Sequence, residues 1–521
     1  MEIERDFTQY IPHYPLFRNA HPSADAYDIA ESEGTGAGTI EKLLARVFDR
    51  IFSYARFDRK SLYFFPDVSD IFTLQQKRML QFLYESKAVR FPTVFFDPPF
   101  NDEPKMFNAV LDPIRLKESY FLHIAPELVE TFGQFHMGHS FAHAEAISKA
   151  IGEYIERFVL LPWRTHSFIC ASEKDLSRKG YTFLLPRIIS KFSEQQKEMH
   201  SEFRLNEELP FFWVKGRSFP GGKSILLPSQ SVFWGYNQSH AQEPFLGESN
   251  TSGAAGMFTQ EGAILSGLRE LIHRDGFLIF WLNTIAPPRI DPSTIQNNRI
   301  SSILRGLKRY RFEVEILDVT TDIGLPSFVT LLIDGSSGEK RAFIGGGASS
   351  VPEEAIEQAL AEVLSIYHYW RRGGSDHFNL PTPYVPFSKE NSVGHFDRVN
   401  LWASPAMFPK LRWFLNGTVY AFGDRKKNYE ICAADPAHEL SFLVQKFKSL
   451  GEEYAIYYFE ARQKFLNTLR YRVVKTVVPA LVPLYLHEHL APLAASRLVQ
   501  VPKKLGYTAI QFPNPLPHPF P

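Results

Sequence analysis

The feature that most constrains the fold of this chain is an internal repeat of a glycine loop followed by a helix. In each copy, a glycine-containing segment leads into an Ala-Ile pair in the first turn of a predicted helix, with a glutamate further along. The copies span residues 138–158, 256–275 and 347–367, and their glutamates are Glu153, Glu270 and Glu362. This pattern predicts a site built from equivalent helices, although it is also typical of a repeated packing unit whose glutamates face solvent.

The first of these helices has a clear apolar stripe. Ile147, Ile151, Ile155 and Phe158 recur at the spacing of one helix face, and Glu153 lies off that stripe. The repeat helices are therefore expected to pack against a core through one side only.

Strands are expected between the helices as hairpins rather than as βαβ units. Residues 211–219 and 224–234 flank a Pro-Gly-Gly-Lys turn, and residues 311–319 and 327–334 flank a second turn at 322–324. The sequence from Gly216 to Ser224 is close to a phosphate-binding loop, but it has one residue too many and lies in a hairpin, so we reject that interpretation.

With 521 residues, the chain is longer than a single hydrophobic core usually organises, so two or three packed units are expected. Near the N-terminus we expect helices over residues 40–54 and 74–86 and a strand over 89–96. Residues 371–395 are expected to be an irregular connection.

Charge and cysteine content exclude several classes of protein. Lys+Arg and Asp+Glu both number 57, which gives no support for a nucleic-acid or membrane-surface partner. Two cysteines cannot form a disulfide framework. The first residues are acidic and polar, unlike a signal peptide, and the apolar stretch 473–486 is broken by Lys475 and two prolines. We therefore expect a cytoplasmic protein.

Five segments carry a resemblance to a known family. Residues 153–157 contain a Glu-x-x-Glu-Arg motif, residues 251–256 a Gly-Ala-Ala-Gly loop, and residues 270–274 a Glu-x-x-x-Arg motif. The turn at 318–326 and the glycine loop at 345–355 follow in the same order. These segments together resemble the YcaO family from about residue 110 to the end.

The C-terminus narrows the resemblance. Residues 514–521 alternate prolines with other residues, and segments 477–483 and 492–497 precede them. This tail is similar to that of azoline-forming cyclodehydratases within the YcaO family. Alternating prolines favour an extended, pre-ordered strand, which could thread the chain end into a pocket at little entropic cost. A frayed terminus is the alternative.

The resemblance implies an α+β fold of mixed and antiparallel sheets with packed helices and the internal repeat. It implies an ATP-binding core over residues 106–400 and a C-terminal segment over 401–521, after an N-terminal unit, 1–105, of unknown role. It also implies ATP and Mg²⁺ as cofactors. The implied nucleotide-binding residues are Glu153, Glu156, Arg157, Glu261, Glu270 and Arg274. The implied metal ligands are Glu153, Glu156 and Glu270, and the implied catalytic residues of the tail are Pro517, Pro519 and Pro521, whose carboxylate is a candidate base.

These residue types suit phosphate chemistry. Mg²⁺ prefers oxygen ligands, and Glu153 and Glu156 share a helix face three residues apart. Arg157 and Arg274 each follow a repeat glutamate by four residues, where guanidinium groups can bind phosphate oxygens. Without the family, the same pairs are typical of exposed i,i+4 ion pairs.

The second repeat departs from the family pattern at three positions. Gly262 stands where a glutamate is usual, with Glu261 one residue earlier, Ser266 replaces a glutamine, and His273 replaces a second glutamate. Each change removes a hydrogen-bonding group or a metal ligand, so either the site uses an altered coordination shell or this copy has lost catalysis.

The resulting hypothesis is an ATP-dependent cyclodehydratase that converts Cys, Ser or Thr of a ribosomally made precursor peptide to thiazoline or oxazoline. We expect a partner protein of the E1-like class to bind the peptide leader, and a homodimer stays open. The alternative is a catalytically weak scaffold that binds peptide within a modifying complex. A third reaction, thioamide or amidine formation, is disfavoured by the proline tail.

Overall fold

The computed structural model describes residues 76, 79, 89–97, 107–113, 118–126, 137–374, 378–389, 393–508 and 512–520. The chain divides into two compact units, and each is described by itself. The first comprises residues 1–99, 106–115 and 132–154, and the second comprises 100–105, 116–131 and 155–521. No helix among the described residues is long and apolar enough to cross a membrane.

The first unit contains an antiparallel three-stranded sheet in the order β1–β2–β3. Its strands are β1 (Val89–Asp97), β2 (Phe107–Pro113) and β3 (Met137–Ser140), and helix α6 (His143–Val159) begins in this unit. The expected strand at 89–96 is confirmed as β1. Of the expected helix 74–86, only Gln76 and Met79 are described, and both are helical, whereas residues 40–54 lie outside the described range.

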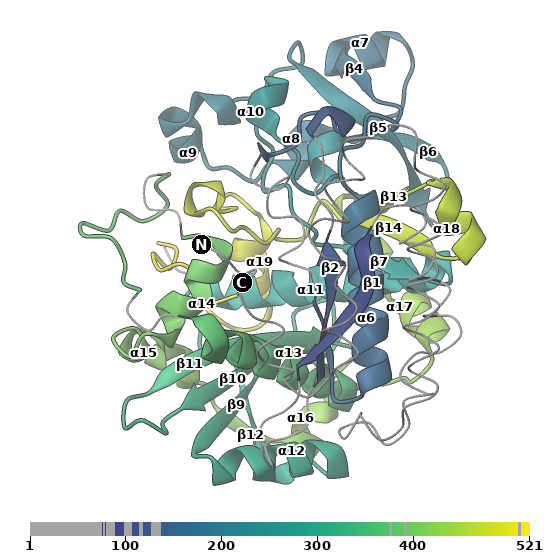
Figure 1. The fold of residues 1–521 in the computed structure, drawn as a ribbon. Coiled ribbons are helices and arrows are strands. Elements are labelled where there is room, and N and C mark those ends of the chain that lie inside the picture. The colour runs from purple at the N-terminus through teal and green to yellow at the C-terminus, as the bar shows by residue number, and fades with distance from the viewer. Residues whose placement is uncertain are drawn as a thin grey trace. The chain divides into compact units, whose positions relative to one another are not determined.

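The second unit contains two sheets (Figure 1). The six-stranded sheet is antiparallel in the order β4–β5–β13–β14–β7, with β6 paired to β5. Its strands are β4 (Ile169–Ser172), β5 (Pro210–Phe219), β6 (Ser224–Pro228), β7 (Ala254–Met257), β13 (Ile456–Glu460) and β14 (Arg472–Val477). The first predicted hairpin is confirmed, although β6 ends at Pro228, which has no N–H to continue a ladder.

The five-stranded sheet has the order β11–β10–β9–β8–β12 and is antiparallel except for the parallel pair β12–β8. Its strands are β8 (Arg289–Asp291), β9 (Phe312–Asp318), β10 (Ser327–Asp334), β11 (Arg341–Ala348) and β12 (Val419–Ala421). The second predicted hairpin is confirmed as β9–β10. Segments on both sides of the boundary expected at residue 400 contribute strands to both sheets, and the expected division into three units stays a prediction.

The helices of the second unit vary from one turn to six. They are α7 (Glu173–Arg178), α8 (Pro186–Ile189), α9 (Glu194–Met199), α10 (Gln238–Ala241), α11 (Gln260–Leu282), α12 (Asn298–Arg309), α13 (Pro352–Gly373), α14 (His395–Ala403), α15 (Phe408–Leu411), α16 (Phe422–Lys426), α17 (Pro436–Leu450), α18 (Lys464–Leu469) and α19 (Arg497–Lys504). The irregular connection expected from residue 371 begins later, because Tyr367 and Trp370 pack on Phe343 of β11 and keep α13 helical to Gly373.

Helix α11 occupies the centre of the second unit. It contacts β7 and β14 of one sheet and β10 and β11 of the other, and most of its residues are buried. A helix that is apolar on nearly all sides is typical of such a buried position. A buried ion pair between Asp275 of α11 and Arg497 of α19, 2.7 Å long, fastens the C-terminal segment to it.

The three repeat helices begin at equivalent positions. Helices α6, α11 and α13 each start three residues before the alanine of the repeated Ala-Ile pair, and each follows a strand, β3, β7 or β11. In two copies a glycine eight residues before that alanine lets the strand touch the helix: a Cβ on Gly138 would lie 2.0 Å from Ala146 O, and one on Gly347 2.3 Å from Ala355 O. The repeat is thus a strand–helix unit with a close backbone contact. The prediction of an α+β fold is confirmed.

Candidate functional site

The glycine loop of the second repeat, residues 250–256, has a backbone that only glycine suits at one point. Gly253 has a φ of +82°, and a Cβ there would lie 2.5 Å from Thr476 O. Strand β14 contacts the loop through a hydrogen bond of 2.8 Å from Thr476 N to Gly253 O. This places the loop between β14 and helix α11.

Three charged side chains bind this loop at successive points. Lys475 Nζ donates to Asn250 O at 2.6 Å, and Arg274 Nη1 donates to Ser252 Oγ at 2.5 Å. Glu270 Oε2 accepts from Gly253 N at 3.0 Å. Two of these groups come from α11 and one from β14, so the fold brings together residues about 200 positions apart in the sequence.

Glu270 and Arg274 also form an ion pair of 2.8 Å with each other. Their side chains are 30% and 22% exposed, which differs from a freely solvated surface pair, and both are committed to the loop. The pair is therefore an i,i+4 ion pair, as the spacing indicates, but it is only partly exposed and both groups also bind the loop. Enough of each group stays accessible for a ligand to reach it.

The third repeat uses its glutamate in the same way. Glu362 of α13 accepts a hydrogen bond from Gly346 N of β11, as Glu270 does from Gly253 N. In two of the three repeats, the glutamate thus accepts a hydrogen bond from the backbone of the glycine segment that precedes its own helix. This structural role accounts for part of the repeat pattern that the sequence displayed.

The first repeat supplies the second unit with Glu156 and Arg157 near the end of α6. Glu156 interacts electrostatically with Lys475 and with Tyr471, whose hydroxyl donates to Gly256 O at 2.7 Å. The Arg157 guanidinium lies 5.2 Å from the centre of the Trp234 ring. Glu153 belongs to the first unit, one helix turn before Glu156, and its predicted metal role stays a prediction.

Burial lowers the pKa values of two groups around the loop. It lowers the pKa of Lys475 to about 8; the carboxylates of Glu270 and Glu156 oppose this shift, and the charge of Arg274 adds to it. Burial, followed by the charge of Arg274, lowers the pKa of His273 to about 3. His273 is therefore neutral at pH 7, whereas Lys475 is mostly charged.

The positions that depart from the family pattern lie at different points of α11, with Gly262 in its first turn and His273 next to Arg274. Glu261 is exposed in the first turn of α11, about 13 Å along the helix axis from Glu270. Gly262 N donates to Thr259 Oγ1, which caps the helix. His273 is buried with its ring against Gly346 and 5.3 Å from the Phe520 ring. The structure does not bring Glu261 together with Glu270 and Arg274.

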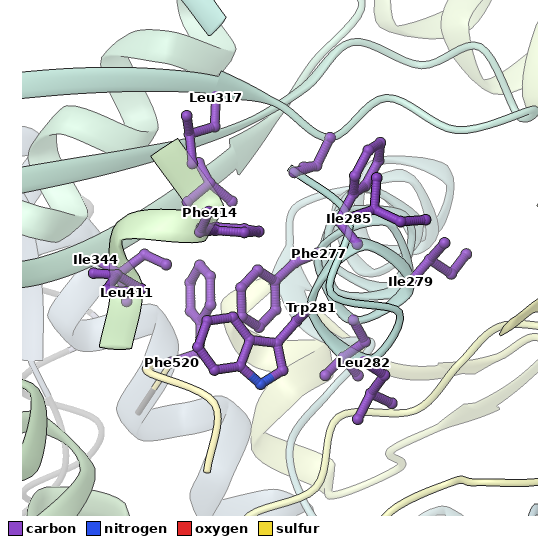
Figure 2. Packing of buried hydrophobic residues seen from close by; sticks show 14 of the residues in the cluster. Phe277, Ile279, Trp281, Leu282, Ile285, Leu317, Ile344, Leu411, Phe414 and Phe520 are labelled. Atoms are coloured by element: carbon purple, nitrogen blue, oxygen red, sulfur yellow. The ribbon is translucent and has the colours of Figure 1, made fainter. Parts of the chain in front are cut away.

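The proline-rich tail is buried along α11. Residues 517–520 are buried, and Phe520 packs against Phe277, 4.5 Å between ring centres, in the apolar cluster that includes Trp281 (Figure 2). Near the other end of α11, Asn514 N donates to Leu282 O at 2.8 Å. The tail therefore runs back along the helix from Leu282 toward His273. The frayed-terminus alternative is wrong for the described part of the tail.

Side chains from four positions bind successive carbonyl groups of the tail. Each donor reaches one carbonyl, at 2.7 to 3.3 Å. The pairs are Tyr384 Oη with Pro515 O, Trp281 Nε1 with Leu516 O, Trp402 Nε1 with Pro517 O, and Arg398 Nη1 with His518 O. Pro517 is held in this way inside the protein, and Pro519, which follows His518, is buried too. Pro521 lies outside the described residues.

Sequence reasoning missed Lys475 and Arg398. Lys475 had a signal, because it is the one charged residue between Val473 and Val478 in an apolar strand. Arg398 had none that we can identify, since its partners are the carbonyls of His518 and Leu486 and the carboxylate of Glu488, all far away in the sequence.

The residues around the loop fit a metal–phosphate ligand. Among the described residues, no group of three or more His, Cys, Asp or Glu is placed to hold a metal by itself. Mg²⁺ commonly takes only one or two carboxylates from a protein and the rest from phosphates and water. Glu156 and Glu270 supply carboxylates near Lys475, and Arg274 and Lys475 supply positive charge for phosphate.

The fold and this loop define an α+β protein with a glycine loop bound by charged groups and a proline tail buried beside it. The chain belongs to the YcaO family, described as YcaO cyclodehydratase, ATP- and Mg²⁺-binding, whose model matches residues 137–482. The predicted family is confirmed, and ATP and Mg²⁺ are the cofactors of this family.

Among curated relatives, an uncharacterized protein of Methanothermobacter thermautotrophicus is 30% identical over 152 residues, 29% of this chain and 39% of the relative. An uncharacterized protein in the tfuA 3′ region of Rhizobium leguminosarum bv. trifolii is 29% identical over 180 residues, 33% of this chain and 42% of the relative. The matches thus span about two fifths of each relative.

Solved structures share the fold at low sequence identity. A heterocyclase in complex with substrate and cofactor has a TM-score of 0.64 at 18% identity, covering 85% of this chain and 57% of that one. The heterocyclase TruD has a TM-score of 0.55 at 21% identity, covering 73% and 51%. YcaO from Methanopyrus kandleri bound with AMPPCP and Mg²⁺ has a TM-score of 0.52 at 18% identity, covering 78% and 91%.

Proposed function

We propose that this protein is an ATP- and Mg²⁺-dependent cyclodehydratase that forms thiazoline or oxazoline rings from Cys, Ser or Thr in a ribosomally made peptide. One observation carries the proposal: Phe520 of the buried proline tail lies beside His273, the residue next to Arg274, which binds the glycine loop. The charged groups that we propose for phosphate binding and the buried tail thus both lie along α11.

The proposed reaction closes a five-membered ring and removes one water from the peptide. The side-chain sulfur or oxygen attacks the carbonyl carbon of the preceding amide, and the displaced amide oxygen must leave. Bound ATP would supply the γ-phosphoryl group that makes this oxygen a good leaving group, with Mg²⁺ neutralising phosphate charge. The products are the azoline ring, ADP and phosphate.

The described residues divide into carboxylates for the metal and cations for the phosphates. Glu156 and Glu270 are the proposed Mg²⁺ ligands of the second unit, and Glu153 is a further one on the evidence of the motif alone. Arg274 is the proposed phosphate ligand; its support is that it is partly exposed and fixed by both Glu270 and Ser252. Such fixed charges stabilise a phosphoryl transfer without reorganising.

The proposed role of the tail is to complete the peptide site. Its carbonyls are bound by indole, phenol and guanidinium groups, so its path is set before a peptide arrives. Pro517, Pro519 and Pro521 then fix the position of the last residues, which we propose accept or orient the proton that leaves the ring nitrogen.

A separate protein is proposed to deliver the peptide. This proposal rests on the resemblance of the chain to azoline-forming members of the YcaO family. We infer a leader-binding partner of the E1-like class, and a homodimer is a further assembly to test. Cys170 and Cys432 are both free, in keeping with a proposed cytoplasmic location.

The test is turnover of ATP by the purified chain with its co-encoded precursor peptide and candidate partner, followed by peptide mass. Loss of one water per modified residue, abolished by Glu156→Gln and retained by Glu145→Gln, is the expected result. Glu145 is the matched control because it is an exposed glutamate in the first turn of the same helix α6.

The scaffold alternative rests on His273, which lies buried against Gly346 and Phe520 and adds no carboxylate to the cluster. Peptide or partner binding without nucleotide binding would establish that alternative. Peptide products in which an amide oxygen is replaced by sulfur would instead indicate thioamide formation, and replacement by nitrogen would indicate amidine formation.

A further inference from the structure

A charged pocket lies in the segment that contains helices α8 and α9, and its lining includes none of the residues that bind the glycine loop. Its volume is about 500 Å³. One lining residue, Leu205, is apolar, and the others are Arg187, Ser190, Glu194, Lys197, Glu198 and Arg204. Sites for small molecules are mostly lined by apolar and aromatic groups with a few polar ones. This pocket therefore fits a charged group better than an apolar metabolite.

Two guanidinium groups of the charged pocket are poorly neutralised. Arg187 is paired with Glu207 at 4.0 Å, and both side chains are more than 60% exposed. Arg204 Nε donates to Lys197 O at 2.8 Å, and among the described residues no carboxylate lies within 4 Å of its guanidinium. The third cation, Lys197, is paired with Glu194 at 2.7 Å. Two guanidinium groups are thus available to an anion, against one remaining carboxylate of the lining.

Ser190 adds a hydroxyl group that the chain leaves unused. Its Oγ is buried and has no hydrogen-bond partner within the part of the chain that the structure describes. A buried polar group without a partner costs free energy, and a ligand in the charged pocket would supply one. Charged residues on a protein surface are ordinarily solvated and need no ligand, but that explanation does not account for the buried hydroxyl.

The walls of the charged pocket are fixed to the chain that leads into the proline tail. Phe192 and Phe203, on either side of α9, stack with their ring centres 3.9 Å apart. From α9 itself, the Gln196 side chain donates to His489 O at 3.1 Å and to Ala491 O at 2.9 Å. A site that is ordered in advance loses less entropy when it binds. The pocket is thus joined to the segment that precedes the tail, which we propose completes the peptide site.

We propose that the charged pocket binds an acidic side chain of the precursor peptide through Arg187 and Arg204. This inference rests on the proposed function for the identity of the peptide, and it adds a peptide subsite away from the glycine loop. Guanidinium groups bind carboxylates by paired hydrogen bonds. A carboxylate is favoured over a nucleic acid because three lining cations and two lining carboxylates give little net charge for a phosphate backbone.

The test measures, by fluorescence anisotropy and without ATP, the binding of two labelled heptapeptides to the full chain. One alternates glycine with glutamate, and the other has glutamine in place of each glutamate. The acidic peptide should bind about ten-fold more tightly or better, and its affinity should fall with added salt, because both guanidinium groups are exposed.

The variant Arg187→Gln/Arg204→Gln should lose this preference, with affinity for the acidic peptide reduced about ten-fold. Arg178→Gln is the matched control, because Arg178 is an exposed cation of the neighbouring helix α7, and it should change neither affinity. Both pocket arginines are exposed, so the double variant should keep its unfolding temperature. If it does not, the two single variants take its place.

A second measurement uses the co-encoded precursor peptide, ATP and the partner protein. Here Arg187→Gln/Arg204→Gln should raise KM several-fold and leave kcat unchanged, because a subsite distant from the reacting atoms contributes equally to ground-state and transition-state binding. A lower kcat with an unchanged KM would contradict a binding role for the pocket.

Other outcomes of the binding experiment overturn the inference. Equal affinity for the two heptapeptides, or a preference that persists in the double variant, shows that the pocket does not bind a carboxylate. Binding of inorganic phosphate without binding of the acidic peptide assigns the pocket to a small anion instead. If the chain cyclises no precursor, the proposed function fails, but the anisotropy measurement needs neither ATP nor cyclisation and still decides whether the pocket binds an acidic peptide.

Discussion

The guanidinium of Arg398 donates a hydrogen bond of 3.0 Å to the main-chain carbonyl of His518 in the proline tail. Arg398 is fully buried on helix α14 and forms an ion pair with the equally buried Glu488. A charged donor is thus held in place by a carboxylate and binds the tail next to its last described residues. Hydrogen bonds from ionised donors are stronger than neutral ones, so this contact is a principal anchor of the tail.

Replacing Arg398 by Met should destabilise the fold and free the tail. Glu488 would be left buried and unpaired, which costs about 3–5 kcal/mol of unfolding free energy. The double variant Arg398→Met/Glu488→Leu should recover most of that loss, but not tail docking. Urea unfolding measures the stability, and a red shift of tryptophan emission reports exposure of Trp281 and Trp402. A double variant with wild-type emission and activity would show that the anchor is dispensable.

Removing residues 517–521 should abolish peptide cyclisation while nucleotide binding persists. The buried ring of Phe520 contributes about 3–5 kcal/mol on the scale of Phe-to-Ala substitutions, so stability also falls. Addition of the free peptide 514–521 should restore part of the activity, and the same peptide with Phe520→Ala should not. Full cyclisation by the truncated chain would contradict the proposed role of the tail.

Glu156→Gln should weaken Mg²⁺-dependent nucleotide binding by about 10-fold or more, since a neutral amide is a poorer ligand for a hard cation. The variant should retain its unfolding temperature, because Glu156 is only partly buried. Titration of the ATP analogue at several Mg²⁺ concentrations measures the effect, and Glu145→Gln, an exposed glutamate of the same helix, serves as control. Equal Mg²⁺ dependence in both variants would remove Glu156 from the proposed metal site.

Gly253→Ala should distort the glycine loop. The positive φ costs an alanine roughly 1–2 kcal/mol, and the contact with Thr476 O adds a clash. Gly180→Ala has a similar φ of +71° with nothing within 4 Å, so it isolates the cost of φ alone. Nucleotide affinity should fall in Gly253→Ala only. Equal stability losses and unchanged affinity in both variants would show that the loop tolerates the extra methyl group.

Lowering the pH should release the tail, because it favours protonation of His518. Burial, followed by the charge of Arg398, holds the pKa of His518 well below its usual range, and Nε2 donates to Tyr485 O. The folded chain therefore resists protonation, so this group adds stability that is fully present above pH ~6.5 and is lost as pH falls below that value. Tryptophan emission should shift to the red as the pH falls below about 6.5. His518→Gln keeps an N–H donor, so its emission should shift less over the same pH range; an identical shift would assign the effect to another group.

The repeat could be predicted because it depends only on the local sequence pattern. Glycine loops, Ala-Ile pairs and apolar stripes each follow from steric and burial rules that act over one helix turn or one strand–helix contact. Helices α6, α11 and α13 accordingly begin at equivalent positions, and both predicted hairpins formed. The rise of a helix also predicts that Glu261 and Glu270, nine residues apart, lie far from each other. The family motif nevertheless made both of them candidate nucleotide-binding residues.

Long-range partners were not predictable in the same way. Nothing near Lys475 indicates that its ammonium meets Asn250 O, 225 residues earlier, and nothing near Arg398 indicates the carbonyl of His518. The burial of His273 against Gly346 and Phe520 joins three distant segments. Such contacts depend on how the sheets pack around α11.

The sequence by itself determined the family, the repeat, the strand pairs and the stiffness of the tail, because each depends on residues close in the chain. Only the tertiary structure decided which charges meet at the glycine loop and where the tail lies. Those outcomes depend on burying apolar surface around α11, which leaves each buried charge or carbonyl to find a partner from whichever segment the packing brings near.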